Sequence, residues 1–121
     1  MQYMLVMCET VERAAERSDP ARAEAYWGAW SAYVEAIGQA GVVVQGAGLE
    51  LPATATTVRV REGRRQVQDG PYADTKEQLG GFFIIDVPSL DAALEWAARS
   101  PAAAFGAVEV RPVLPPPSRP A

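Results

Sequence analysis

Residues 69–87 read DGPYADTKEQLGGFFIIDV and join a turn, a short polar segment and an apolar strand. Within this stretch, residues 82–87 are apolar except for Asp86. A strand with apolar side chains on both faces is typical of a sheet that is covered on both sides. We therefore predict that residues 82–87 form the central strand and that the other elements pack around it.

The polar segment ahead of this strand carries local structure signals of its own. Asp69 opens an Asp-Gly-Pro sequence, which predicts a turn. Asp74 and Glu77 have the spacing of a capping box, in which each side chain bonds to the backbone near the other. This spacing predicts one helical turn, which the glycine pair at residues 80–81 closes.

Strand signals recur along the rest of the chain. Runs dominated by apolar or β-branched residues predict further strands at residues 3–8, 42–45 and 108–113. Residues 54–68 predict a hairpin that turns at Glu62 and Gly63 and places Val58 opposite Val67. The hairpin has a thin apolar face, so we expect it at the margin of the sheet.

Two amphipathic helices are predicted as well. The first begins at Ser18 or Asp19 and ends at Gly41, and the second begins at Ser89 and stops at the Ser100-Pro101 pair. A connection of small residues follows at 102–107. The expected buried stripe of the first helix is Tyr26, Trp30, Tyr33 and Ile37, widened by Trp27 and Val34. That of the second is Leu90, Ala93, Leu94, Trp96 and Ala97.

These elements predict an α+β protein with a ferredoxin-like antiparallel sheet, two helices on one face and an inserted β-hairpin. We expect residues 1–113 to form one domain and residues 114–121 to form a proline-rich tail. Because the strands at 3–8 and 82–87 are apolar on both faces, the face without helices needs a cover. A second copy of the same sheet is the simplest one, so we expect a symmetric homodimer.

Composition excludes several classes of function. The chain has 121 residues, 49% of them hydrophobic, and a formal net charge of −4, which argues against nucleic-acid binding. The basic run of Arg59, Arg61, Arg64 and Arg65 is interpreted as the solvated arms of the hairpin. We see no export signal and no membrane span in the sequence.

Histidine is absent and Cys8 is the single cysteine. A disulfide within the chain is thus impossible, and a reducing cytoplasm is the expected location. The usual histidine-based nucleophile arrangements and zinc ligand sets are excluded. With no phosphate loop and no dinucleotide glycine pattern, we expect neither a cofactor nor a metal. Cys8 is interpreted as a buried small hydrophobe.

The motifs together resemble one family. The run from Asp69 through residue 101, followed by GAVEVRPV, is similar to the signature half of the YCII-related family, in its branch named for an Asp-Gly-Pro-Phe (DGPF) motif. The opening YMLVM and the passage AGVVVQGAGLELPATATTVRVREG resemble the same branch. Tyr72 stands where the motif name has phenylalanine, which keeps the ring and adds a hydroxyl.

The resemblance implies a ferredoxin-like fold that dimerises as a dimeric α/β barrel. A catalytic role has been suggested for YCII-type proteins from a His-Asp pair in a cleft, and this chain, having no histidine, does not carry that pair. Members of the DGPF branch are often encoded beside extracytoplasmic-function sigma factors. The resemblance therefore implies a sigma-factor link as a further expectation.

Asp69 and Glu77 are the candidate catalytic residues. Asp69 either accepts hydrogen bonds from turn amides or acts in catalysis, and Glu77 either completes the capping box or serves as a general base in the cleft. Tyr72 is either a partly buried anchor or a donor to a ligand. Lys76 is either solvated or the holder of an anion.

Three further residues are candidate ligand-binding groups. Glu109 and Arg111 alternate with valines on the last strand, so both face the partner sheet, either as an ion pair that fixes the dimer register or as a ligand clamp. Asp86 in the central strand is read in the same way.

The preferred function is small-molecule binding in the cleft between the two sheets of a homodimer. One alternative is a cofactor-free isomerase, lyase or oxygenase that uses Glu77 or Asp69 as base and Arg111 to hold an anionic substrate. Another is a regulatory partner of a sigma factor.

Overall fold

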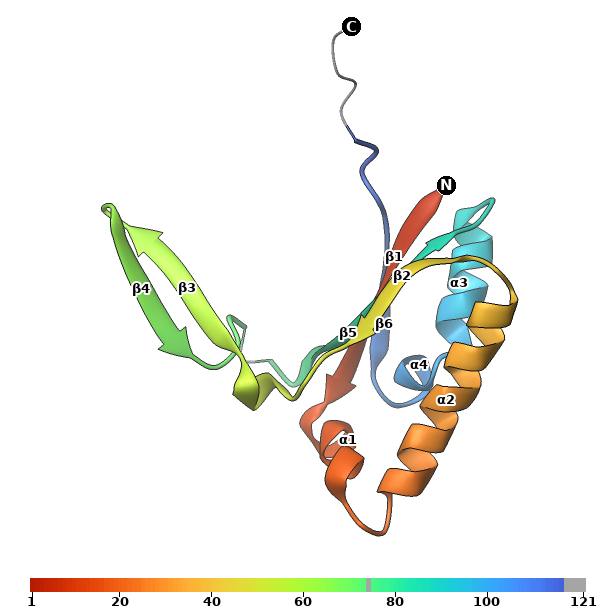
Figure 1. Ribbon diagram of the computed structural model, residues 1–121, viewed down its shortest axis with the longest axis horizontal. Helices are drawn as coiled ribbons and strands as arrows, with labels where there is room; N and C mark the ends of the chain where they lie inside the picture. The colour runs from red at the N-terminus through yellow and green to blue at the C-terminus, as the bar shows by residue number, and fades with distance from the viewer. Residues whose placement is uncertain (74, 117–121) are drawn as a thin grey trace, which may run out of the picture.

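The computed structural model describes residues 1–73 and 75–116 (Figure 1). A four-stranded antiparallel sheet has the order β2-β5-β1-β6, which is the ferredoxin-like order. Its strands are β1 (Gln2–Thr10), β2 (Val43–Gly48), β5 (Glu77–Asp86) and β6 (Ala107–Pro112). The helices are α1 (Val11–Ala15), α2 (Ala23–Gln39), α3 (Leu90–Ala98) and α4 (Pro101–Phe105), with 3-10 turns η1 (Glu16–Ser18) and η2 (Pro52–Thr54). The predicted fold class is confirmed.

The two faces of the sheet differ because side chains alternate along each strand. In β1, Tyr3, Leu5 and Met7 are buried on the face that α2 and α3 cover (Figure 1). Met4 and Val6 point to the opposite face and are half-buried. We call this second side the open face. The core thus lies between the sheet and the helices.

Helix α2 begins later than predicted. It starts at Ala23, not at Ser18 or Asp19, because α1 and η1 occupy the preceding residues and Asp19 caps only the turn before it. Gly41, with φ of 71°, follows its end as expected. Tyr26, Tyr33 and Ile37 are buried and Trp30 is partly buried. Trp27 and Val34 were wrongly assigned to the buried stripe, since each is 49% exposed beside it.

The second predicted helix is α3, and its cap is confirmed because the Ser89 hydroxyl accepts a hydrogen bond from the Ala92 amide at 3.1 Å. Its buried residues are Ala93 and Ala97, whereas Leu90 and Leu94 are nearly half exposed, contrary to prediction. The alanines bring this helix close to the sheet, and the two leucines, one turn apart, lie together at one edge of the contact.

The connection predicted at residues 102–107 is partly helical. Ser100 caps α4 by accepting a hydrogen bond from the Ala103 amide at 3.2 Å, and Pro101 occupies the first turn. A proline is tolerated there because the first amides of a helix have no partner within it. The Ser100-Pro101 pair therefore ends one helix and starts another.

The helical turn predicted before the central strand is wrong in its described part. Asp74 lies outside the described residues, but β5 already begins at Glu77, which pairs with Thr10 of β1. Gly81 pairs with Met7 and Leu79 pairs with Cys8, so Gly80 is the extra residue of a β-bulge. Pairing with β1 gives this segment ladder hydrogen bonds that a single helical turn lacks.

The predicted hairpin forms from β3 (Thr56–Arg61) and β4 (Arg64–Asp69), with Val58 opposite Val67 as expected. Glu62 and Gly63 form its turn with φ of 53° and 72°. The hairpin is not at the margin of the main sheet, however, and instead forms a separate two-stranded sheet (Figure 1). Pro52 and Pro71 flank it and have no amide to extend the ladder.

In the part of the chain described here, no helix is both long enough and apolar enough to cross a membrane.

Candidate functional site

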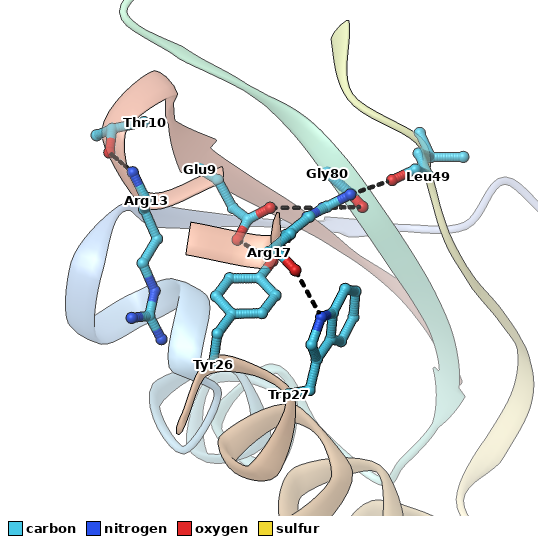
Figure 2. Close-up of polar contacts among 8 residues, drawn as sticks. All are labelled: Glu9, Thr10, Arg13, Arg17, Tyr26, Trp27, Leu49 and Gly80. Carbon is cyan, nitrogen blue, oxygen red and sulfur yellow. Dashed lines mark hydrogen bonds and ion pairs between the residues drawn. The ribbon is translucent and has the colours of Figure 1, made fainter. Parts of the chain in front are cut away.

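A buried polar cluster lies where β1 ends (Figure 2). Glu9 is only 5% exposed, and its Oε1 accepts a hydrogen bond from Nη2 of Arg17 at 2.6 Å. The Tyr26 hydroxyl donates a short hydrogen bond to Oε2 of the same carboxylate. Arg17 Nε donates in turn to the Tyr26 oxygen at 2.9 Å. The three side chains form a closed ring of charge-assisted hydrogen bonds.

Arg17 extends this cluster to neighbouring segments. Its Nη1 donates to the Leu49 carbonyl at 2.6 Å, and its Nη2 also lies 3.4 Å from the Gly80 carbonyl (Figure 2). The Trp27 indole donates to the Arg17 carbonyl at 3.1 Å. One guanidinium therefore joins the end of β2 and the bulge of β5 to η1 and α2.

The bulge residue of β5 must be small because of this cluster. A Cβ atom on Gly80 would lie 2.7 Å from Oε1 of Glu9 and 3.2 Å from Nη2 of Arg17. Carbon and oxygen atoms do not approach that closely without displacement. Gly80 is therefore part of the construction of the cluster.

Burial raises the pKa of Tyr26, and the hydrogen bond to Glu9 raises the pKa further. Both effects disfavour the charged phenolate. The phenol accordingly stays protonated near neutral pH and remains a donor to the carboxylate.

A cavity of about 330 Å³ adjoins this cluster. Glu9 and Arg17 form its charged border, and apolar side chains of α1, η2 and β5 form most of the remaining wall. The apolar wall residues are Val11, Ala14, Ala15, Leu51, Pro52, Ala53, Pro71 and Leu79. A concave apolar space with a few fixed polar groups is the usual form of a small-molecule site.

A second, wider hollow of about 730 Å³ lies at the base of the hairpin. It shares one wall with the cavity, formed by Leu51, Pro52, Pro71, Gln78 and Leu79. Tyr72 and Glu77 line this second hollow, so the structure brings these two predicted residues together. Tyr72 is 76% exposed, and its ring lies 5.2 Å from the guanidinium carbon of Arg59.

The other predicted residues near the turn lie apart from both spaces. Asp69 ends β4, pairs with Thr56 in the hairpin ladder and is exposed. Lys76 is exposed and lines neither the cavity nor the hollow. Asp69 and Lys76 thus do not line the hollow that Tyr72 and Glu77 share.

The three remaining candidates lie on or beside the open face. Glu109 and Arg111 form an ion pair of 3.1 Å, with side chains 56% and 72% exposed in the single chain. Asp86 binds the terminal ammonium group of Met1 at 2.8 Å. None of the three lines either space.

Cys8 also faces the open side and is half-buried. Burial raises the pKa of its thiol, and the nearby carboxylates of Glu77 and Glu109 raise that pKa further. All three effects oppose formation of the thiolate, which is the reactive form.

Glu9 and Arg17 were not among the predicted site residues. The signal for Glu9 was the period of two in β1, which places residue 9 on the same face as Tyr3, Leu5 and Met7. A carboxylate on the core side of a strand requires a buried partner.

Comparison with known proteins is consistent with this architecture. An uncharacterised protein of Rhizobium meliloti (strain 1021) is 47% identical over 83 residues, which are 67% of this chain and 64% of that relative. This chain therefore matches somewhat less than two thirds of the length of the relative.

A solved structure of 5-chloro-2-hydroxyhydroquinone dehydrochlorinase from Burkholderia phenoliruptrix AC1100, in complex with 2,5-dihydroxybenzoquinone, is similar over 94% of both chains. Its TM-score is 0.53 and its sequence identity is 18%, so the likeness concerns the fold.

The family of YCII-related domains matches residues 1–116, nearly the whole chain. The protein therefore belongs to the family of YCII-related domains.

Proposed function

We propose that this protein is a homodimeric, small-molecule-binding member of its family and that the ligand occupies the cavity beside Glu9 and Arg17. The observation that carries the proposal is the cavity of about 330 Å³, in which apolar walls meet a buried, hydrogen-bonded ion pair. Such a space suits a small, largely apolar molecule that carries an oxygen acceptor.

The polar groups indicate the orientation of this ligand. Both oxygens of Glu9 already accept hydrogen bonds, and Arg17 uses Nε and both terminal nitrogens in bonds to the protein. Terminal guanidinium nitrogens carry two hydrogens each, so Nη1 retains one donor after binding Leu49. A ligand carbonyl, hydroxyl or carboxylate oxygen would approach this donor, with its apolar part against η2 and α1.

The cavity also agrees with the expected dimer. Thr10 and Leu79 line the cavity and belong to the open-face register of β1 and β5. A second sheet packed on that face would lie next to the cavity and limit the access of water. The cleft between the sheets and the cavity would then form one continuous site.

The dehydrochlorinase with the similar fold provides a reasonable chemical starting point. Its structure holds 2,5-dihydroxybenzoquinone, a flat ring with oxygen substituents. A ring of this class has the apolar body and oxygen acceptors that the cavity walls and Arg17 require. We therefore choose this quinone as the first probe.

The binding proposal is tested with the quinone and two matched variants. Ala53 lines the cavity, whereas Ala32 is exposed on α2 outside it. Ala53→Trp should fill the cavity and abolish binding measured by saturation-transfer NMR, and Ala32→Trp should leave binding unchanged. Equal binding by both variants, or no binding by the unaltered protein, would contradict the proposed site for this ligand class.

A second candidate function is acid-base catalysis in the wider hollow. It is favoured because Glu77 and Tyr72, a carboxylate and a phenol, both line this hollow. Glu77 would take a proton from a substrate whose oxygen receives a hydrogen bond from Tyr72. Proton exchange at an acidic C–H of a candidate substrate, followed in deuterated water, should fall at least about a hundredfold in Glu77→Gln. Unchanged exchange in that variant would exclude this mechanism.

The sigma-factor link stays a prediction that no described residue supports. Its test is co-purification with a sigma factor at micromolar concentration, and the lack of a complex would count against it.

A further inference from the structure

The hairpin of residues 56–69, which we call the arm, packs little against the rest of the described chain. Figure 1 shows β3 and β4 leaving the sheet on the side away from α2 and α3. The two strands contact chiefly each other. An isolated two-stranded hairpin is only marginally stable in water.

The base of the arm is fixed to the chain that enters and leaves it. The Gly70 amide donates to the Ala55 carbonyl at 2.7 Å, and the Thr57 hydroxyl donates to the Gly70 carbonyl at 2.8 Å. Pro52 and Pro71 restrict the backbone on either side. These bonds hold the two ends of the arm together where it joins the rest of the chain.

One face of the arm is apolar and exposed. Val58 and Val67 form a cross-strand pair, each 57% exposed, and Val60 on the same side of β3 is 60% exposed. Small β-branched residues grouped in this way favour burial against another surface. Within residues 1–73 and 75–116, the body of the chain leaves these valines uncovered.

The charge of the arm is opposite to that of the body. The arm contains four of the eleven basic residues and two of the fifteen acidic residues, so its formal charge is +2. The rest of the chain then carries −6, because the total is −4. Glu77, Asp86 and Glu109 lie on or at the margin of the open face of that acidic body.

We propose that the arm docks on a second copy of this chain, with its valines against the body of the partner and Arg65, which pairs with Val60 on the same face, beside the carboxylates there. With a two-fold axis, the arm of each copy would contact the body of the other, so the same pair of surfaces would meet twice. The charge separation favours a protein of this composition over a nucleic acid, which the acidic body would repel. This inference rests on the homodimer of the proposed function and assigns the arm a role in it.

The test changes the apolar face of the arm without changing its strands. Threonine has a high β-propensity and a shape similar to that of valine, so Val58→Thr, Val60→Thr and Val67→Thr together should preserve the hairpin. The dimer dissociation constant, measured by sedimentation equilibrium, should rise at least about tenfold. Val34→Thr on α2, where the valine is 49% exposed, is the matched control and should leave the constant unchanged.

Hydrogen exchange of the unaltered protein gives an independent reading. Amides of residues 56–69 should exchange rapidly at low protein concentration and become protected as the dimer forms. Protection that does not depend on protein concentration would contradict docking of the arm on a second copy, even if the triple variant failed to fold.

The outcomes separate the two proposals. A dimer whose dissociation constant does not respond to the triple substitution removes the role of the arm and leaves the ligand cavity and the homodimer standing. A monomeric wild-type protein of 13.0 kDa at all concentrations contradicts both the homodimer and the arm contact.

Discussion

Arg17 Nη2 lies 2.6 Å from Glu9 Oε1, so the 3-10 turn after α1 is tied to the core side of β1. The side chain of Arg17 is 14% exposed and that of Glu9 is 5% exposed. Removal of either partner would leave a charge in a place with little access to water, which costs more than the loss of a surface pair.

Glu9→Ala should lower the free energy of unfolding by about 3–5 kcal/mol, because Arg17 and Tyr26 then lose their shared acceptor. Glu35→Ala on the exposed side of α2 is the control and should change stability by about 0.5 kcal/mol or less. Urea denaturation followed by circular dichroism measures both. Equal effects of the two substitutions would show that the Glu9 ring does not stabilise the fold.

Gly80→Ala should destabilise the protein by about 1–3 kcal/mol, because the added methyl group meets Oε1 of Glu9 at 2.7 Å. Gly28 in α2 has nothing within 4 Å of the corresponding position. Gly28→Ala should therefore stabilise the protein by about 0.5–1 kcal/mol. The two glycine substitutions should thus change stability in opposite directions, and thermal unfolding of both variants tests this directly.

The buried phenol of Tyr33 should make the protein less stable at high pH. Burial raises its pKa to about 12, and its hydroxyl donates to the Trp96 carbonyl at 2.8 Å. An unfolded tyrosine has a pKa of about 10, so the stability that the neutral phenol contributes is complete below about pH 10. It is lost between about pH 10 and the folded-state value, where the unfolded chain ionises first.

Tyr33→Phe should therefore lose less stability than the unaltered protein between about pH 9 and about pH 11.5, by about 2 kcal/mol. Urea unfolding at the two pH values gives the comparison. Because the pKa of Tyr26 is also raised, some pH dependence will persist in the variant. An identical loss in both proteins would mean that Tyr33 ionises as freely in the fold as outside it.

Cys8 provides a probe of the proposed homodimer, since it is half-buried on the open face. The rate of its alkylation should fall by about tenfold or more as the protein concentration rises through the dimer dissociation constant. A Cys8→Ser, Ser18→Cys variant carries its thiol at an exposed position outside the sheet and should react at a constant rate. A constant rate at Cys8 as well would argue that the open face stays uncovered.

The strands were predictable because apolar or β-branched runs mark them and because the turns carry specific residues. Glu62 and Gly63 fixed the hairpin register, and Ser89 fixed the start of α3. The orientation of the hairpin was not predictable, because it depends on where two prolines direct the chain rather than on alternation within it.

The candidate site was predicted less well than the fold. Tyr72 and Glu77 do share a hollow, but Glu77 belongs to a strand, where pairing with β1 outweighed the capping signal. The buried ring of Glu9, Arg17 and Tyr26 joins residues up to 17 positions apart through tertiary packing. Local motifs do not report such a contact, although the side-chain alternation of β1 marks one member of it.

The bulge at Gly80 decides which face of the sheet each of residues 77–79 occupies. With this extra residue, Leu79 pairs with Cys8 and Glu77 pairs with Thr10 on the open side. If Gly80 instead paired with Cys8 in a regular ladder, residues 77–79 would shift by one place relative to β1, and each would turn to the other face of the sheet. Glu77 would then point toward the helices and Gln78 away from them. The pairing at Gly80, and not the composition of the segment, therefore decides which side chains form this wall and which chemistry a ligand meets there.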